Sequence, residues 1–341
     1  MSAARGSMVA TEDLRNALEH ALGDHFEVKK RIAQLDRSPC VYGSSYALEE
    51  LAVELDDGTK LDLMFKQLGE SGLSERGRAA KPQFLHDPLR EIEVYGSVLV
   101  QANLGTARFY GAAVDPARQR YWLFIESVPG VALWQIGEFE IWQEVARWAA
   151  SLHDRFADDG TATGDHLLAY DADFYRLWIG RALEFADRWE ARRPGVARET
   201  IERLARGYEE VVERLAALPA TFIHGELYAS NVLVADEGDA PRVCPIDWEI
   251  AALGPGLVDL AALTMGKWNA SERAALASAY REARGRPEQL PAPEEFDRTL
   301  DCARLHLAVQ WLGWAPDWKP PRSQRHDWIE EAAALAENLG L

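Results

Sequence analysis

A polar loop between two short apolar runs constrains this chain more than any other part of its 341 residues. The run 221–223 precedes the loop and the run 232–234 follows it, with His-Gly-Glu-Leu-Tyr-Ala-Ser-Asn between them. Short apolar runs bounded by turn-forming residues predict strands. We therefore expect a loop that is anchored by strands at both ends, which would fix the side chains of Glu226 and Asn231 in place.

A second acid follows soon after this loop. Asp247 directly follows the short strand expected over 243–246, and Glu249 stands two residues later. Phosphoryl transfer needs a carboxylate near the acceptor hydroxyl, oxygen ligands for Mg²⁺, and cations on the phosphates. Glu226 would provide the carboxylate, and Asn231 with Asp247 a pair of hard oxygen ligands. Asp247 could instead be a capped strand end, but its spacing from Asn231 favours a metal role; a ligand role for Glu249 stays open.

The first third of the chain predicts a small antiparallel sheet. Two apolar runs, 46–55 and 61–68, flank the turn Asp56-Asp-Gly58. Asp-Gly between apolar runs is a strong hairpin signal. A helix is expected over 89–100, opened by a proline as helices favour, and another short strand over 121–125.

The rest of the chain predicts mainly helices. Apolar residues recur at three- and four-residue steps in Ile141, Val145, Trp148, Leu152 and Phe156. This spacing is typical of an amphipathic helix, and the segments 174–192 and 198–218 repeat it. The break at Ser127-Val-Pro-Gly130 predicts a lobe boundary, with an N-terminal lobe over 1–126 and a C-terminal lobe over 127–341. We expect an α+β protein.

These features resemble the aminoglycoside phosphotransferase and choline kinase family, which shares the two-lobed fold of the protein kinases. The loop is similar to the family's H-x-D-x-x-x-x-N catalytic loop. The other matching segments are Tyr42-Gly43-Ser44-Ser45 for the phosphate-covering loop, Lys66 for the lysine of the third strand, Arg90-Glu91 with Tyr95 for the following helix, Leu152-His153 for the first large helix, and Asp247-Trp-Glu with Gly254 and Asp259-Leu-Ala261 for the metal-binding segment and the helix after it. The resemblance implies a small N-terminal antiparallel sheet lobe and a larger, mainly helical C-terminal lobe.

The resemblance also implies which residues bind the nucleotide. Lys66 would contact the α- and β-phosphates and would be held by Glu91, with Glu93 as a rival partner. As a lone residue, Lys66 would be a surface charge, so its role depends on the other motifs. The implied nucleotide-binding set is Gly43, Ser44, Ser45, Lys66, Glu91, Glu126 and Val128, of which the Gly-Ser-Ser turn is the weakest assignment.

The implied catalytic set is Glu226, Asn231, Asp247 and Lys66, with Asn231 and Asp247 as the Mg²⁺ ligands. His224 would be structural and tie the loop to the segment near Asp247. Asp259 would be a buried acid that braces the loop. His153 is expected to be a buried, hydrogen-bonded structural histidine rather than a general base.

Glu226 departs from the family, which usually has Asp at this position. The two acids have similar reference pKa values, about 4.3 and 3.9, so ionisation changes little. Their reach differs by roughly one C–C bond, about 1.5 Å, and a misplacement of about 1 Å can cost about a hundredfold in rate. Either the acceptor pocket is adapted to Glu226 or catalysis is impaired.

The composition disfavours several classes of binding partner and site. Lys plus Arg number 37 against 55 Asp plus Glu, for a net charge of −18, and no basic run marks a nucleic-acid surface. The three cysteines, Cys40, Cys244 and Cys302, are far apart, which favours neither disulfides nor zinc and fits a reducing compartment. No stretch of about 18 uncharged apolar residues indicates a membrane span. We expect a cytoplasmic protein.

The sequence therefore predicts a Mg²⁺-dependent kinase that uses ATP or GTP to phosphorylate a hydroxyl of a small molecule. An antibiotic or related natural product is the favoured acceptor, with choline-type amino alcohols and sugars as alternatives. A second hypothesis, prompted by Glu226, is a catalytically weak or inactive kinase-like protein that binds nucleotide or ligand. A protein kinase is disfavoured, because no D-F-G or A-P-E segment is present. The tryptophans Trp311, Trp314, Trp318 and Trp328 are expected mainly in the core, although some could line an acceptor pocket.

Overall fold

The computed structural model describes residues 9–40, 45–157, 164–236, 238, 240–266, 268–314 and 326–341. Tyr42, Gly43 and Ser44 of the expected phosphate-covering loop, and Trp318, lie outside these residues. The chain forms two compact units, Met1–Gly130 and Val131–Leu341. Within the described residues, no helix is both long and apolar enough to span a membrane.

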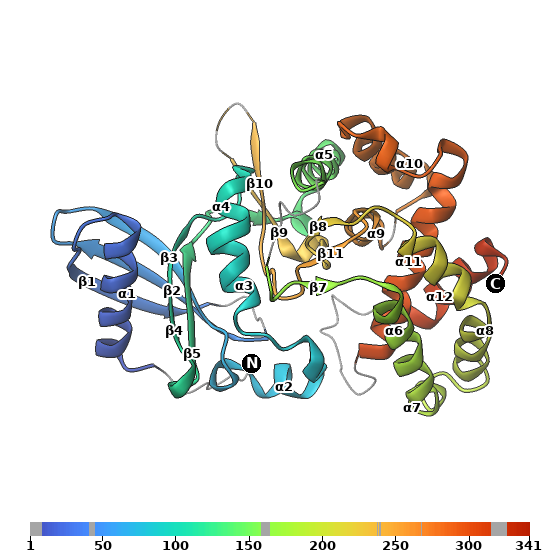
Figure 1. Ribbon diagram of the computed structural model, residues 1–341, viewed down its shortest axis with the longest axis horizontal. Coiled ribbons are helices and arrows are strands. Elements are labelled where there is room, and N and C mark those ends of the chain that lie inside the picture. The colour runs from blue at the N-terminus through green and yellow to red at the C-terminus, as the bar shows by residue number, and fades with distance from the viewer. Residues whose placement is uncertain are drawn as a thin grey trace. The chain divides into compact units, whose positions relative to one another are not determined.

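The N-terminal unit is built on a five-stranded antiparallel sheet of order β1-β2-β3-β5-β4 (Figure 1). The strands and helices are β1 Ile32–Pro39, β2 Ala47–Leu55, β3 Lys60–Gln67, β4 Phe109–Asp115, β5 Arg120–Glu126, α1 Thr11–His25, α2 Glu75–Ala80, α3 Arg90–Glu93 and α4 Val100–Ala102. The hairpin expected around Asp56-Asp-Gly58 is present, with Glu54 opposite Lys60. Gly58 has φ +84°, a conformation in which glycine avoids the steric cost of a side chain.

The two faces of this sheet differ in chemistry: one packs in an apolar core, and the other presents a lysine. Leu14, Leu18 and Leu22, four residues apart on α1, pack in one core with Leu63 and Phe65 of β3. Side chains alternate along a strand, so the residue after Phe65 points to the opposite face of the sheet. That residue is a lysine, and α3 lies against it there.

The helix expected over 89–100 forms, but not as one α-helix. After α3 the chain continues as a π-helix over Val94–Leu99 and ends in α4. Asn103, with φ +53°, follows in the left-handed region that asparagine tolerates. The wider π-helical turn buries Val94, Tyr95, Val98 and Leu99.

The C-terminal unit is mainly helical. Its elements are α5 Phe139–Arg155, α6 Ala172–Glu184, α7 Ala186–Glu190, α8 Ala197–Ala216, α9 Leu257–Thr264, α10 Ala270–Ala283, α11 Pro293–Trp314, α12 Trp328–Leu339, β6 Val131–Ala132, β7 Leu168–Ala169, β8 Thr221–Ile223, β9 Val232–Asp236, β10 Pro241–Pro245 and β11 Ala252–Gly254. The largely buried helix α11 packs against α6, α8, α9 and α12, while α10 packs on α5 (Figure 1). The single helix expected over 174–192 is divided at Phe185, between α6 and α7.

Two three-stranded sheets in this unit position the polar loop. Their orders are β10-β9-β6 and β7-β11-β8. The loop therefore leaves one small sheet at the end of β8 and enters the other at the start of β9. Because β10 pairs antiparallel with β9, with Pro245 opposite Val232, the residues after β10 return to the end of the loop.

Candidate active site

A buried carboxylate holds the beginning of the polar loop. Asp259 of α9 is fully buried, and its Oδ2 and Oδ1 accept hydrogen bonds from the backbone N–H groups of His224 and Gly225, each at 2.8 Å. Gly225 has φ +82°, and a Cβ there would lie 2.7 Å from the Ile250 carbonyl oxygen. The turn thus needs glycine, and Asp259 braces the loop as the sequence predicts.

His224 ties the loop to the strand that precedes Asp247. Its Nε2–H donates to the Ile246 carbonyl at 2.9 Å, and its Nδ1 accepts from the Glu226 backbone N–H at 3.2 Å. A carbonyl can only accept and a backbone N–H can only donate, so these contacts fix the neutral Nε2–H tautomer. The structural role predicted for His224 is confirmed.

The loop also closes on itself. Asn231 Nδ2 donates to the Glu226 carbonyl at 3.0 Å, and the Tyr228 N–H donates to the same carbonyl at 2.6 Å. The Asn231 carbonyl accepts from the Ile246 N–H at 2.8 Å, which brings the loop's end next to the residue before Asp247. The side-chain nitrogen of Asn231 is therefore engaged inside the loop, and its side-chain oxygen accepts from the neighbouring Ser230 hydroxyl at 3.2 Å. That oxygen is the atom of this side chain suited to a metal ion.

Asp247 itself adopts an uncommon backbone conformation. Its φ is +67°, and non-glycine residues in this region often mark sites where geometry serves function. The next residue, Trp248, is fully buried, stacks on Phe222 at 5.5 Å and donates its Nε1–H to the Pro245 carbonyl at 3.1 Å. A buried indole thus anchors the segment immediately beside Asp247.

Carboxylate oxygens gather beside this anchor. One oxygen of Asp247 and one of Glu249 lie within 4.8 Å of each other. Carboxylate oxygens and the amide oxygen of Asn231 are hard oxygen donors, which Mg²⁺ prefers. The chemistry of these side chains fits a magnesium site in the C-terminal unit.

The N-terminal unit contains a buried ion pair. Lys66 Nζ on β3 lies 2.6 Å from Glu91 Oε2 on α3, and the two residues are 4% and 2% exposed. Glu93, the rival considered from the sequence, is half-buried and lies outside this pair. Removing one member of such a pair would leave an uncompensated buried charge, which costs about 3–5 kcal/mol.

Glu126, the last residue of β5, and Val128 belong to the implied nucleotide-binding set. The Glu126 N–H donates to the Arg108 carbonyl at 2.8 Å, and its carboxylate accepts from the Arg108 N–H at 3.0 Å. The Val128 carbonyl accepts from the Gly130 N–H at 2.8 Å. Ser45, the described member of the expected phosphate-covering loop, accepts from the Ser74 N–H through its carbonyl at 2.9 Å.

Two tyrosines beside Glu226 were not identified from the sequence. Burial, followed by the nearby Glu226 carboxylate, raises the pKa of Tyr170 and of Tyr228. The Tyr228 hydroxyl accepts a hydrogen bond from Trp311 Nε1 at 2.9 Å, and Trp311 stacks on Trp328 at 5.3 Å. Tyr228 lies in the loop two residues after Glu226, and this closeness in sequence could have identified it as a site residue.

The comparisons with known proteins agree with this arrangement. The model of the phosphotransferase enzyme family matches residues 89–298. Solved structures with similar folds include a choline kinase from Cryptosporidium parvum (14% identity, 89% of this chain and 88% of that chain, TM-score 0.57) and a microcompartment-associated aminopropanol kinase (15%, 90% and 90%, 0.56). A third is the GDP complex of aminoglycoside 2'-phosphotransferase-IIIa (14%, 90% and 93%, 0.57). A search of curated proteins found no match. At these identities the structural likeness shows the fold, which is the two-lobed protein-kinase-like fold expected from the sequence.

Proposed function

Because this chain belongs to the phosphotransferase enzyme family, we propose that it is a small-molecule kinase that transfers the γ-phosphate of ATP or GTP to a hydroxyl group with Mg²⁺ bound. The observation that carries the proposal is the loop between β8 and β9. There Asp259 fixes the turn, the His224 side chain and the Asn231 carbonyl bind the segment before Asp247, and Glu226 lies between these two residues in the loop. Bracing of this kind holds a side chain in a fixed geometry, as a catalytic acid requires.

The chain's own residues divide the chemistry between them. Glu226 accepts a hydrogen bond from the acceptor hydroxyl and takes its proton late, when the bond to phosphorus is largely formed. Asn231 and Asp247 hold Mg²⁺, with Glu249 as a further ligand. When bound, the ion supplies positive charge to the phosphate oxygens. Lys66 contacts the α- and β-phosphates and is held in place by Glu91.

The N-terminal unit would also supply the groups that bind the nucleotide. Gly43, Ser44 and Ser45 would give backbone N–H groups to the phosphates. At the end of β5 and just after it, the Glu126 N–H and the Val128 carbonyl are engaged within the unit. The described residues include no acceptor for the Val128 N–H, so this amide is the group we assign to the base. Backbone contacts of this kind leave the choice between ATP and GTP open.

For the acceptor, we favour an antibiotic or related natural product that carries both hydroxyl and amino groups. The partly exposed indoles of Trp311 and Trp328 stack next to Tyr228, two residues from Glu226, and aromatic faces attract cations. The chain's net charge of −18 favours a cationic ligand as well.

The same observation favours a second candidate, an amino-alcohol metabolite. Two of the similar structures are described as a choline kinase and an aminopropanol kinase. Both of those compounds combine a hydroxyl with a positively charged nitrogen, as aminoglycosides do. The three cysteines, all within the described residues, form no disulfide, and we place this reaction in the reducing cytoplasm.

Phosphate transfer by the purified protein tests the proposal. ATP or GTP with Mg²⁺ would be offered against hydroxyl-bearing antibiotics, amino alcohols and sugars, with mass spectrometry of each acceptor. We expect a gain of one phosphate on one class of acceptor, lost in Glu226→Ala. In Glu226→Asp the carboxylate is withdrawn by about 1.5 Å, so the rate should fall if the pocket is adapted to Glu.

Two results would count against this account. Saturable nucleotide binding without transfer to any acceptor would favour a catalytically weak or inactive kinase-like protein. A gain of transfer in Glu226→Asp would show that Glu226 impairs catalysis rather than serving an adapted pocket.

A further inference from the structure

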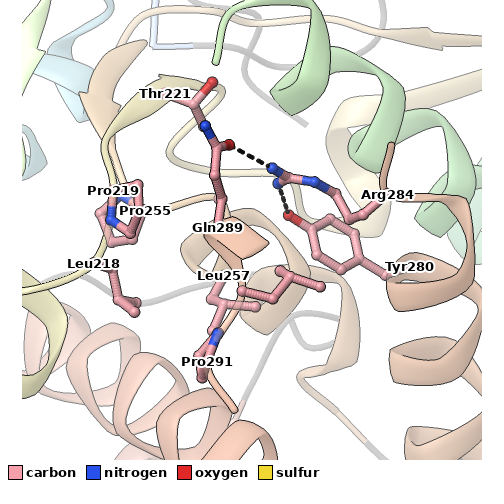
Figure 2. A pocket seen from close by; sticks show the side chains of 11 residues that line it. Leu218, Pro219, Thr221, Pro255, Leu257, Tyr280, Arg284, Gln289 and Pro291 are labelled. Carbon is pink, nitrogen blue, oxygen red and sulfur yellow. Dashed lines mark hydrogen bonds between the residues drawn. The ribbon is translucent and has the colours of Figure 1, made fainter. Parts of the chain in front are cut away.

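A hydrogen-bonded chain runs from the end of α10 towards the polar loop. It begins at Arg284, the residue after α10, whose Nη1 and Nη2 donate to the Tyr280 hydroxyl and to Gln289 Oε1, each at 3.0 Å (Figure 2). The Nε of the same guanidinium lies 2.8 Å from Asp154 Oδ1. Arg284 is 8% exposed and is thus fixed on three sides.

The direction of each hydrogen bond in this chain follows from Arg284. A guanidinium has no acceptor, so the Tyr280 oxygen must accept from it and must point its own O–H elsewhere. The atom in reach is His153 Nδ1, at 2.8 Å. His153 Nδ1 is therefore an acceptor, and the ring proton sits on Nε2, which donates to Asp259 Oδ2 at 3.2 Å.

Asp259 is the point where this chain meets the loop. Its carboxylate accepts from His153 on one side and from the backbone N–H groups of His224 and Gly225 on the other. In the opposite tautomer, the lone pair of His153 Nε2 would face the carboxylate, and two acceptors would repel each other. The tautomer of His153 that Tyr280 and Arg284 select is the one that stabilises Asp259 in its bracing position.

A glycine leaves room for the central hydrogen bond. A Cβ on Gly256 would lie 2.5 Å from His153 Nδ1 and 2.7 Å from the Tyr280 hydroxyl oxygen. The backbone at Gly256 has φ −57°, which any residue can adopt, so glycine is needed here for space alone. The chain passes so close to the Tyr280–His153 contact that a methyl group would occupy the place of the hydrogen bond.

Little of this network is exposed to solvent. The cavity beside Tyr280 and Arg284 has a volume of about 20 Å³, which is close to the space that one water molecule needs. Prolines and leucines form much of its wall, including Pro255 and Leu257 (Figure 2). Tyr280 and His153 are fully buried, so the O–H and the ring have few alternatives to each other.

We propose that Tyr280 and Arg284 are positioning residues for phosphoryl transfer, which fix the tautomer of His153 and, through Asp259, hold the turn that carries Glu226. The catalytic part of this proposal rests on the proposed function. The positioning part concerns the backbone of His224 and Gly225 and can be measured without a substrate.

The chain offers a matched control in a second buried tyrosine–histidine contact. The Tyr208 hydroxyl lies 2.9 Å from His306 Nδ1, and both residues are at most 1% exposed. Tyr208→Phe removes the same atom from the same kind of contact as Tyr280→Phe. His306 has no carboxylate partner among the described residues, and its ring reaches the loop only by packing edge-on against Tyr170, at 5.9 Å between ring centroids. The control therefore compares a hydrogen-bonded connection through Asp259 with a packing contact.

Two measurements on the full chain test the proposal. Hydrogen exchange of peptides covering 222–228 reports the backbone amides that Asp259 holds. Steady-state kinetics with MgATP and the acceptor found in the panel separates kcat from KM. We expect Tyr280→Phe to speed exchange in this segment about tenfold. A turn displaced by less than the about 1 Å that costs a hundredfold should lower kcat about tenfold with little change in KM.

A second pair of variants covers the case in which Tyr280→Phe does not fold. Arg284→Lys keeps a cation that can only donate, and should preserve slow exchange. Arg284→Met removes the donor, and should raise exchange as Tyr280→Phe does. Rescue by lysine would support a directing role rather than simple packing.

The outcomes separate the two layers of the proposal. Exchange that rises in Tyr280→Phe but not in Tyr208→Phe supports positioning, even if no variant and no wild-type protein transfers phosphate, in which case the proposed function alone has failed. Unchanged exchange in Tyr280→Phe, or an equal rise in Tyr208→Phe, would overturn the positioning role. Unchanged kcat together with faster exchange would overturn its catalytic consequence.

Discussion

Two buried histidines in the C-terminal unit make the same contact, from Nδ1 to a tyrosine hydroxyl, but differ in what their other ring nitrogen contacts. His153 on α5 and His306 on α11 are fully buried, and each Nδ1 lies within 2.9 Å of a tyrosine hydroxyl. The difference lies at Nε2. That of His153 faces Asp259 and so reaches the polar loop, whereas that of His306 has no hydrogen-bond partner among the described residues. One contact thus supports a site, and the other belongs to the core between α8 and α11.

Their ionisation follows from these surroundings. Burial lowers the pKa of His153, and the hydrogen bond and charge of Asp259 partly oppose the shift. Burial alone lowers the pKa of His306 to about 3. Both rings are therefore neutral near pH 7.

The largest expected effect comes from altering Asp259, the hydrogen-bond partner that His153 has and that His306 lacks among the described residues. Asp259→Asn places an NH₂ group where the carboxylate accepts three hydrogen bonds, so at least one buried donor loses its partner. We expect the free energy of unfolding to fall by about 3–5 kcal/mol, measured by urea denaturation. The control Asp171→Asn should change it little, because Asp171 caps α6 and asparagine caps helices equally well. A loss below about 1 kcal/mol in Asp259→Asn would contradict the bracing role.

Filling the space beside the Tyr280–His153 contact should have the next largest effect. Gly256→Ala is expected to lower the free energy of unfolding by about 2 kcal/mol, as overpacking of a rigid interior does. It should also speed hydrogen exchange in 222–228. Unchanged stability and exchange would show that the contact can move aside at little cost.

The pH dependence distinguishes the two histidines. The unfolded pKa of His306 is near 6.5 and the folded value about 3, so the unfolded state binds more protons and stability is lost as pH falls below 6.5. Between pH 6.5 and pH 5 this contributes about 1.5 kcal/mol. His306→Gln should flatten the acid limb of stability against pH by that amount, as seen in urea titrations at each pH. An unchanged slope would show that the His306 ring does not stay neutral.

The smallest expected effect is a gain. Gly180 lies inside α6, and no atom lies within 4 Å of a Cβ built there. Gly180→Ala should raise the free energy of unfolding by about 0.5–1 kcal/mol, because glycine loses more backbone entropy in a helix. Gly→Ala would then raise the free energy of unfolding at Gly180 and lower it at Gly256. A loss of stability at both positions would show that the space around each glycine does not decide the effect.

The polar loop and the acid that holds it could be predicted from the sequence, because much of their signal is local. His224, Glu226 and Asn231 stand together in the sequence, and their spacing predicts a held loop with an acid and a metal ligand. Asp259 was assigned by resemblance, and its hydrogen bonds place it as expected. The hairpin at Gly58 was equally readable, because its turn chemistry is local.

The rest depends on contacts that no local pattern encodes. Tyr280 and His153 are 127 residues apart, and an ordinary helical tyrosine gives no sign of its partner. The π-helix at Val94–Leu99 differs from an α-helix by one residue in its hydrogen bonding, which apolar spacing does not resolve. Helix α1 was not assigned, although Leu14, Leu18 and Leu22 carry a helical spacing.

Phosphate transfer by Asp247→Asn tests the central claim most directly. Asparagine tolerates the left-handed backbone of Asp247, so the variant should fold, and its unfolding midpoint serves as the control. It lacks the negative charge with which Asp247 would hold Mg²⁺, and the bound ion would stabilise the transition state by several kcal/mol. We expect transfer from MgATP to fall about a thousandfold with an unchanged midpoint. Near-normal transfer by this variant would contradict the magnesium site and the mechanism built on it.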